Sequence, residues 1–232
     1  SPGVRASNFY GTLSCDATCI FANEAGIYFH DGSFVDVGQL IAGAGTMSTA
    51  DFIGGQYLFT DVLGEVVNHG HMRGDSITLL GQRVANFGYV ETPGGSFAML
   101  AGGSILLRDH DSPIVIESPL PPPADAEAGF GDTPAVENAG TIDAGDGSVR
   151  LAAGDMLSFA IRQSGEIRAR RIALEGGDGG LVEVTGALDA SDATSGHTGG
   201  EIDVLGDYVA VAGDARLDAS GSAGGGRIRV GG

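Results

Sequence analysis

Six aspartates in the second half of the chain are the side chains that could carry out catalysis. If a repeating fold placed them on one face, their carboxylates could act as acid and base on a polysaccharide, or bind Ca²⁺ through their oxygens. The glycine-rich run at 176–180 does not repeat at the spacing of a calcium-binding nonapeptide. We therefore expect a solvated acidic face and no enzyme, with a polysaccharide-active enzyme as the alternative. The six residues are Asp143, Asp146, Asp189, Asp192, Asp203 and Asp218.

Two short motifs could hold a cross-link or a metal ion. Cys15 and Cys19 are close enough in sequence for a short disulfide, which suits an exported protein, and two free thiols are the alternative. A zinc site would need more ligands than this pair provides. His69 and His71 would lie on the same side of a strand, as half of a metal site, but no carboxylate partner is evident and we expect an ordinary exposed pair. We expect no metal and no cofactor.

The charges exclude several classes of function. The chain has 12 Lys+Arg, all of them arginine, against 30 Asp+Glu, for a net charge of -18. Without lysine there is no Schiff-base chemistry and no P-loop. The negative charge argues against nucleic-acid binding, and the cluster Arg168, Arg170 and Arg171 is interpreted as a solvated face. No apolar run is long enough to span a bilayer, so we expect no membrane insertion, and the abrupt first residues suggest a mature or truncated segment.

The elements that would position these groups are short strands. The chain contains 41 Gly and 8 Pro, which indicates frequent turns, and no three-turn amphipathic helix is evident. Short apolar or alternating runs bounded by turn residues predict strands. They are 20–22, 27–29, 34–37, 77–80, 105–107, 182–184, 202–204 and 228–230.

The strands come as a repeated phrase, a Gly, one residue and an aliphatic residue. Copies lie about 18 to 25 residues apart, the range of solenoid repeats, except for one long gap between Gly88 and Gly140. Asn68, Asn86 and Asn138 each stand two residues before such a Gly, which fits a left-handed turn. A second phrase leads from a glycine-rich turn into another strand. The first phrase occurs at Gly70-His71-Met72, Gly88-Tyr89-Val90, Gly140-Thr141-Ile142, Gly165-Glu166-Ile167 and Gly186-Ala187-Leu188.

These repeats predict a β-solenoid of stacked parallel strands, with aliphatic side chains inside and charged ones outside. We expect residues 1–232 to form one solenoid domain. Residues 118–134 hold most of the prolines and cannot join a strand ladder, so we expect a surface loop there, with a partner-binding polyproline segment as the alternative. Repeat rungs then occupy 135–232.

The first 117 residues also carry a family resemblance. After the apolar residues Ile20-Phe21-Ala22 stands Asn23-Glu24-Ala25-Gly26-Ile27, followed by further strand-like residues at 34–42. This part resembles the secretion domain of filamentous-haemagglutinin-like exoproteins of two-partner secretion. That family has Asn-Pro-Asn-Gly-Ile at this point, so Asn, Gly and Ile agree, and Glu24 and Ala25 replace Pro and Asn. The ending from Leu217 onward is similar to the repeats of the same exoproteins.

The resemblance implies an all-β fold, a right-handed parallel β-helix. It implies secretion from a Gram-negative bacterium through an outer-membrane β-barrel transporter, whose periplasmic domains would recognise Asn23, Glu24, Ala25, Gly26 and Ile27. It further implies a non-catalytic role at the cell surface or outside the cell, in adhesion through a carbohydrate or other surface ligand, or in a biofilm matrix. Because open strand edges can pair with another copy, end-to-end stacking into filaments is an alternative role.

Overall fold

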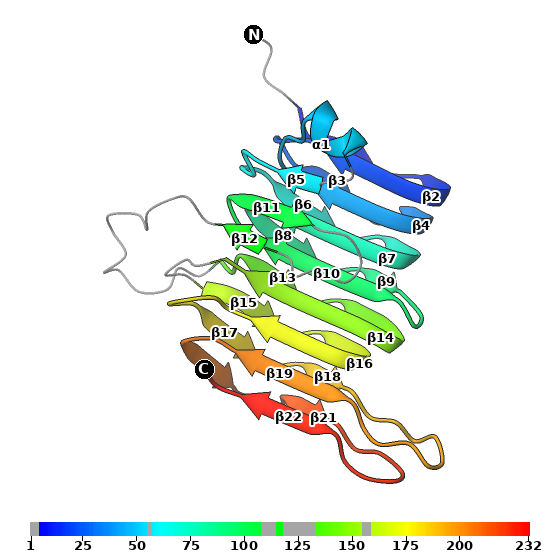
Figure 1. The fold of residues 1–232 in the computed structure, drawn as a ribbon, viewed down its shortest axis with the longest axis vertical. Helices are drawn as coiled ribbons and strands as arrows, with labels where there is room; N and C mark the ends of the chain where they lie inside the picture. Colours follow the sequence, from blue (N-terminus) through cyan, green and yellow to red (C-terminus); the bar gives the residue numbers. More distant parts are fainter. Residues whose placement is uncertain (1–4, 55–56, 108–114, 118–132, 155–158) are drawn as a thin grey trace.

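The chain winds into a stack of short parallel strands that pair with the coils before and after them (Figure 1). The computed structural model describes residues 5–54, 57–107, 115–117, 133–154 and 159–232. In this part of the chain, one face of the stack is a parallel sheet, here called the first sheet. Its strands, in spatial order, are β1 (Ser7–Phe9), β3 (Ile27–Phe29), β6 (Glu65–Asn68), β8 (Arg83–Asn86), β13 (Val136–Asn138), β15 (Phe159–Gln163), β17 (Leu181–Val184) and β20 (Tyr208–Val211).

A larger parallel sheet, here called the second sheet, forms the rest of the wall. Its long strands bend part-way, with register shifts between Cys15 and Thr18 and between Asp143 and Ser148. Each coil thus contributes a first-sheet strand and one bent strand or two short ones. The strands are β2 (Thr12–Ala22), β4 (Phe34–Gly43), β7 (His71–Gly81), β9 (Tyr89–Glu91), β10 (Ser96–Ala101), β14 (Thr141–Ala153), β16 (Glu166–Glu175), β18 (Ala187–Asp189), β19 (Glu201–Leu205), β21 (Arg216–Asp218) and β22 (Arg227–Val230).

The side chains that point into the coil form continuous apolar columns. The aliphatic residues of the repeated phrase, Met72, Val90, Ile142, Ile167 and Leu188, pair in register from coil to coil, and all are fully buried. Fixing short strands in a stack costs conformational entropy, which burial of such columns offsets. The predictions of an all-β chain with parallel strands, and of each of the eight short strands, are confirmed.

The prediction that outward positions hold charged and polar side chains is wrong where a further sheet covers the second sheet. Ile41, Leu80 and Leu100 point away from the main core, yet they are buried in a second apolar cluster. An antiparallel sheet lies over them, and its Phe59 and Ile105 complete the cluster. This covering sheet consists of β12 (Val115–Glu117), β11 (Ser104–Leu107) and β5 (Tyr57–Phe59), and the short helix α1 (Thr49–Ile53), which the sequence did not predict, precedes β5.

The expected left-handed turns at Asn68, Asn86 and Asn138 are also wrong. In the described residues Asp61 is the one non-glycine residue with positive φ. The asparagines are extended, and their fully buried side chains point into the core as one column that continues to Gln163. Each amide donates to the next, from Asn68 Nδ2 to Asn86 Oδ1, Asn86 Nδ2 to Asn138 Oδ1 and Asn138 Nδ2 to Gln163 Oε1, at 2.8 Å in each case.

Two further predictions concern the limits of the fold. The proline-rich segment 118–134 lies outside the described residues except for its last two positions. Among the helices that the structure describes, none has the length and hydropathy to cross a membrane. Both sheets are continuous from the strands before the proline-rich segment to the strands after it, because β8 pairs with β13 and β10 pairs with β14.

Candidate functional site: the Asn23–Ile27 turn and its surroundings

The Asn23–Ile27 motif forms the tight turn that leads from β2 into β3. The Gly26 amide donates to the Asn23 carbonyl at 2.9 Å, and the Ala25 amide donates to Asn23 Oδ1 at 3.0 Å. Gly26 has φ +106°, a conformation that L side chains rarely adopt. Asparagine and glycine at these positions are therefore explained by turn geometry.

The Asn23 side chain also fixes the strand before it. Its Nδ2 donates to the Arg5 carbonyl and to Ser7 Oγ, both at 2.9 Å, and so ties the turn to β1. Ile27 lies in the core with no exposed surface, and Gly26 is also buried. Of the five motif residues, Asn23, Glu24 and Ala25 are therefore the ones with surface that a partner could contact.

A hollow of about 300 Å³ opens beside this turn. Ala25 lies on one side, with Leu63 from the next coil, whose side chain is exposed. Tyr28 and Arg83 form the polar part, and both bind Glu65: the Tyr28 hydroxyl donates to Oε1 at 2.7 Å, and Arg83 Nη1 lies 3.0 Å from Oε2. Burial, followed by the hydrogen bond to Glu65, raises the pKa of Tyr28 to about 12.

These residues begin a series of ion pairs that extends along the first sheet. Arg83 Nη2 lies 2.7 Å from Glu137, and in the following coils Arg162 lies 3.9 Å from Glu137 and 3.2 Å from Glu183. These ion pairs were not predicted from the sequence. The available signal was opposite charges at paired positions of successive strands, Glu65 with Arg83, and two residues further along the strand Glu137 with Arg162 and Glu183. It can be read only once the coil register is known.

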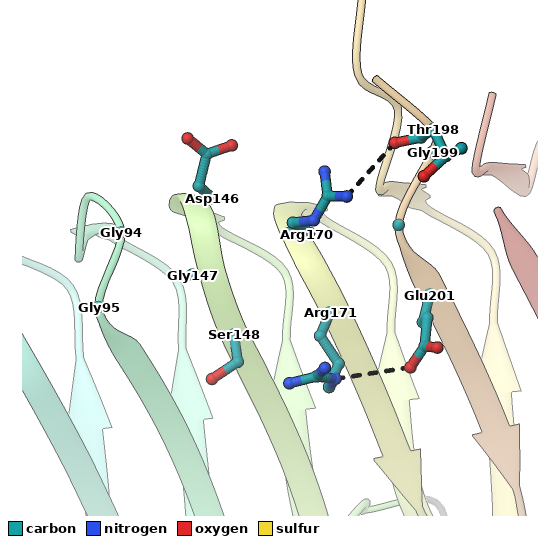
Figure 2. A pocket seen from close by; sticks show the side chains of 11 residues that line it. Gly94, Gly95, Asp146, Gly147, Ser148, Arg170, Arg171, Thr198, Gly199 and Glu201 are labelled. Atoms are coloured by element: carbon teal, nitrogen blue, oxygen red, sulfur yellow. Dashed lines mark hydrogen bonds and ion pairs between the residues drawn. The ribbon is translucent and has the colours of Figure 1, made fainter. Parts of the chain in front are cut away.

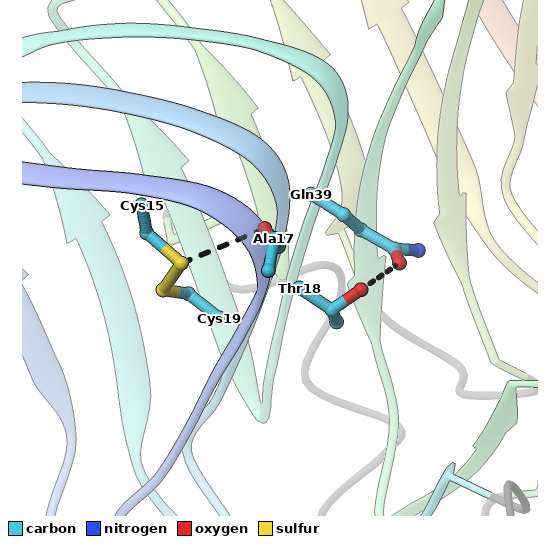
Figure 3. The surroundings of a disulfide bond; sticks show 5 residues. All are labelled: Cys15, Ala17, Thr18, Cys19 and Gln39. Atoms are coloured by element: carbon cyan, nitrogen blue, oxygen red, sulfur yellow. Dashed lines mark hydrogen bonds between the residues drawn. A yellow bond between two sulfur atoms is a disulfide. The ribbon is translucent and has the colours of Figure 1, made fainter.

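The Cys15–Cys19 pair lies at the bend of β2 (Figure 3). The two Cα atoms are 6.6 Å apart and the sulfur atoms are joined as a disulfide. Both side chains pack against the main core. The residues between them form the bulge over β4, where Thr18 Oγ1 donates to Gln39 Oε1 at 2.8 Å. A cross-link here would hold the bulge of the first long strand in shape.

His69 and His71 do not lie on the same side of one strand, because β6 ends before His69 and β7 begins at His71. His69 follows β6 and stacks on Phe87, with centroids 5.0 Å apart, whereas His71 begins β7 and lies 2.9 Å from Glu91 Oε1. The missing carboxylate partner of His71 is thus Glu91, one coil further on. Within the described residues, no group of three or more His, Cys, Asp or Glu side chains is placed to hold a metal ion.

The six aspartates are divided between different columns and turns. Asp143, Asp189 and Asp218 share one column, but Arg168 stands between the first two. Hydrogen bonds from Ser220, together with the neighbouring Arg216, lower the pKa of Asp218 to about 2. Asp203 pairs with Arg229 at 3.0 Å. The alignment of all six on one face, on which the polysaccharide-active alternative depends, is therefore wrong.

Asp192 and Asp146 lie near a hollow of about 510 Å³ along the bend of the second sheet (Figure 2). Arg170 lies 3.0 Å from Asp192, and hydrogen bonds from Thr194 and then His197 lower the Asp192 pKa. Arg171 lies 3.5 Å from Glu201 across the floor of the hollow. These two arginines thus belong to ion pairs between coils.

The comparison with known families decides to which family the fold belongs. A family model described as the TPS secretion domain, where TPS stands for two-partner secretion, matches residues 2–204. The chain belongs to the TPS secretion domain family. It is therefore part of a two-partner-secretion exoprotein, exported from a Gram-negative bacterium, and this family is not a catalytic one.

A solved TPS structure supports the same fold. The chain is similar to the HMW1 secretion domain from Haemophilus influenzae, with a TM-score of 0.71 and 23% identity over 86% of this chain. The match covers 53% of that structure, so this chain spans about half of its length. No curated protein matches the chain. The resemblance of the Asn23–Ile27 stretch to the secretion motif thus agrees with the family of the TPS domain as a whole.

Proposed function

We propose that the chain is the export signal domain of a larger adhesive exoprotein, and that its transporter recognises the surface around the Asn23–Ile27 turn. The observation that supports this most is the position of the turn. Asn23, Glu24 and Ala25 reach the surface beside a hollow whose walls offer an exposed Leu63 and the polar Tyr28. An apolar contact next to fixed polar groups is the usual composition of a specific interface.

In this proposal the motif has two roles. Gly26 and Ile27 hold the turn and the core, and the three residues before them contact the periplasmic domains of the outer-membrane transporter. After export, the coils wind as a right-handed parallel β-helix, the hand that the family resemblance implies. The exported rod then acts at the cell surface, in adhesion or in an extracellular matrix, without catalysis. Several outward carboxylates form ion pairs with arginines of neighbouring coils. This supports a role in joining the coils of a rod and not in catalysis.

The transporter contact is tested by binding the purified chain to the periplasmic domains of its transporter. Glu24→Lys reverses a charge at the turn without removing a hydrogen bond of the fold, and we expect it to weaken binding about tenfold or more. Asp214→Lys is the matched control, because it makes the same change of net charge at an exposed turn far along the stack. Equal binding by both variants and the unaltered chain would refute the contact.

The disulfide belongs to the same proposal, because an exported protein folds in an oxidising compartment. Alkylation of the denatured chain, followed by mass measurement, should label neither cysteine until a reductant is added. Labelling of both cysteines before reduction would show that the pair consists of free thiols in the exported protein.

A further inference from the structure

The corner between the first and second sheets carries aromatic and histidine rings in two parallel columns. One column follows the ends of the first-sheet strands, and the other lies at the starts of the second-sheet strands. We call these seven residues the ring corner. The first column is Tyr10, His30, His69 and Phe87, and the second is Phe34, His71 and Tyr89.

The later coils show that the fold itself does not need these rings. Backbone hydrogen bonds continue the first column and strand pairing continues the second, through the same corner of every following coil. None of these equivalent positions holds a ring. They are Ala139, Ser164, Thr185 and Ala212 in the first column, and Thr141, Glu166, Ala187 and Arg216 in the second. Seven rings in the first coils therefore call for an explanation other than packing of the coil.

Glycine residues lie between the two columns of rings. A Cβ at Gly88 would overlap the Gly70 carbonyl, and one at Gly140 would overlap the Gly88 carbonyl, so these positions must be free of side chains. In the coil of His30 and Phe34, Asp31 and Ser33 stand between the columns. Where single glycines separate the columns, a hollow of about 500 Å³ opens, lined by Phe34, His69, His71 and Tyr89 with Ser33, Gly32, Gly70 and Gly88. The result is a shallow groove, open to solvent, that runs from coil to coil.

The surfaces of this groove combine apolar ring area with fixed polar groups. Phe87 is 40% exposed, Tyr89 37% and Tyr10 68%, so a substantial part of each ring is accessible. His71 Nε2 is held 2.9 Å from Glu91 Oε1, and His30 Nε2 lies 2.7 Å from Asn8 Oδ1. Rings that are apolar on their faces and polar at one edge suit a ligand with the same division.

From this geometry we propose that the ring corner binds a neutral glycan chain. A sugar ring presents C–H groups on its faces, which pack on aromatic rings, and hydroxyl groups at its edge, which can bond to His71, Glu91 and Asn8. Tyr10 stacks on His30 with centroids 4.2 Å apart, and His69 stacks on Phe87 at 5.0 Å, so their facing surfaces are covered. A chain of sugars would therefore lie along the outer, solvent-exposed edges and faces of rings that recur in successive coils. The net charge of -18 and the carboxylate of Glu91 disfavour an anionic glycan.

This inference deepens the adhesive part of the proposed function and is independent of the transporter contact. The ring corner follows the end of β3, whereas the Asn23–Ile27 turn leads into its start. The two surfaces adjoin at Tyr28 and His30, whose ring centroids are 6.3 Å apart, and the glycan test therefore uses Phe87 and Tyr89 of a later coil. Glycan binding can therefore fail while transporter binding by the same purified chain is intact, and the reverse also holds.

The test is binding of the whole purified chain to neutral oligosaccharides of glucose, mannose, galactose and N-acetylglucosamine, with heparin oligosaccharides as the anionic probe. Saturation-transfer NMR reports contact between aromatic rings and sugar protons, and calorimetry gives Kd. The double variant Phe87→Ala with Tyr89→Thr introduces the residues that the next coil has at Ala139 and Thr141, so the coil should fold. We expect it to weaken binding about tenfold or more.

Phe52→Ala is the matched control, because Phe52 is an aromatic residue of similar exposure on α1, away from the corner. It should bind the same sugar as tightly as the unaltered chain. The proposal is overturned if no neutral oligosaccharide binds, if heparin oligosaccharides bind more tightly than every neutral one, or if Phe52→Ala weakens binding as much as the double variant does.

Discussion

At the scale of single residues, the buried amide column shows how a polar group can be stable inside an apolar core. An unpaired buried amide is costly, but Asn68, Asn86, Asn138 and Gln163 satisfy one another along the stack. The last donor, Gln163 Nε2, reaches the Gly165 carbonyl at 3.0 Å. In the next coil the same position is Val184, fully buried, so the column ends where apolar packing resumes.

We predict that Asn86→Ala lowers the free energy of unfolding by about 2–4 kcal/mol, because it removes the acceptor of one Asn68 Nδ2 hydrogen and the donor to Asn138 Oδ1 in the core. Asn68 Nδ2 keeps its second bond, to the Gly70 carbonyl. Urea denaturation at neutral pH measures the loss. Asn8→Ala is the control, since Asn8 is an exposed asparagine, and it should change stability by less than about 0.5 kcal/mol. A similar loss in both variants would mean that the column contributes nothing specific.

The asparagines also show where prediction from sequence stops at this scale. Their spacing was visible, yet an asparagine two residues before a glycine fits a turn residue and an inward-pointing amide equally well. What separates the two is the neighbouring coil, which supplies a second amide within bonding distance. Gln163 extends the column although it is not an asparagine, so a search for one residue type could not have found it.

Ionisation of Tyr28 gives a second prediction for a single residue. Its pKa is raised in the folded protein to about 12, so its contribution to stability is complete below its ordinary pKa of 10.0 and is lost as the pH rises through about 12. A phenolate absorbance titration should therefore contain a late step. Tyr28→Phe should remove this step, and Glu65→Gln should move it to lower pH, because it removes the carboxylate that accepts the hydroxyl proton. Burial also raises the pKa of Tyr89, so the outcome that would contradict the assignment is a step near pH 12 of unchanged amplitude in Tyr28→Phe.

At the scale of elements, strands were predictable and their covering was not. Runs such as Ile77–Leu80 are short, apolar and bounded by turn residues, and they lie in strands as expected. A continuous apolar run is typical of a strand that is buried on both faces. In this chain, apolar residues on the outer face of a strand indicated that another sheet covers it. That sheet could not be predicted, because β5 and β11 are far apart in sequence and are brought together only by the fold.

We predict that Leu80→Ala destabilises the chain by about 3 kcal/mol, because Leu80 is fully buried between the second and covering sheets. Thr78→Ala is the control, since Thr78 points to the same side of β7 but is only partly buried. Urea denaturation of both variants measures the difference. If Leu80→Ala unfolds at the same urea concentration as Thr78→Ala, the covering sheet adds no packing to this strand.

At the scale of the whole molecule, arginine and carboxylate side chains join the coils from outside. Arg83 contacts Glu65 in one neighbouring coil and Glu137 in the other, and Arg162 extends the series of ion pairs to Glu183. Such partly exposed pairs each add little stability, but they favour one register of stacked repeats over others. The sequence predicted stacked repeats and an acidic outside, and the motif turn could be found from its residues. The surface around that turn could not, since it is assembled from three coils.

The glycine columns allow the last prediction, which concerns how the stack unfolds. At Gly140 a Cβ would overlap the Gly88 carbonyl of the preceding coil, so Gly140→Ala must push apart two coils that pair on both sides of this corner. We expect a loss of about 3 kcal/mol or more. Amide hydrogen exchange should show lost protection in β9, β13 and β14 first, because each coil is stabilised by its neighbours. Gly224→Ala is the control, since its nearest atom would be 3.9 Å away. Equal protection in the two variants would show that close contact at this corner does not hold the coils together.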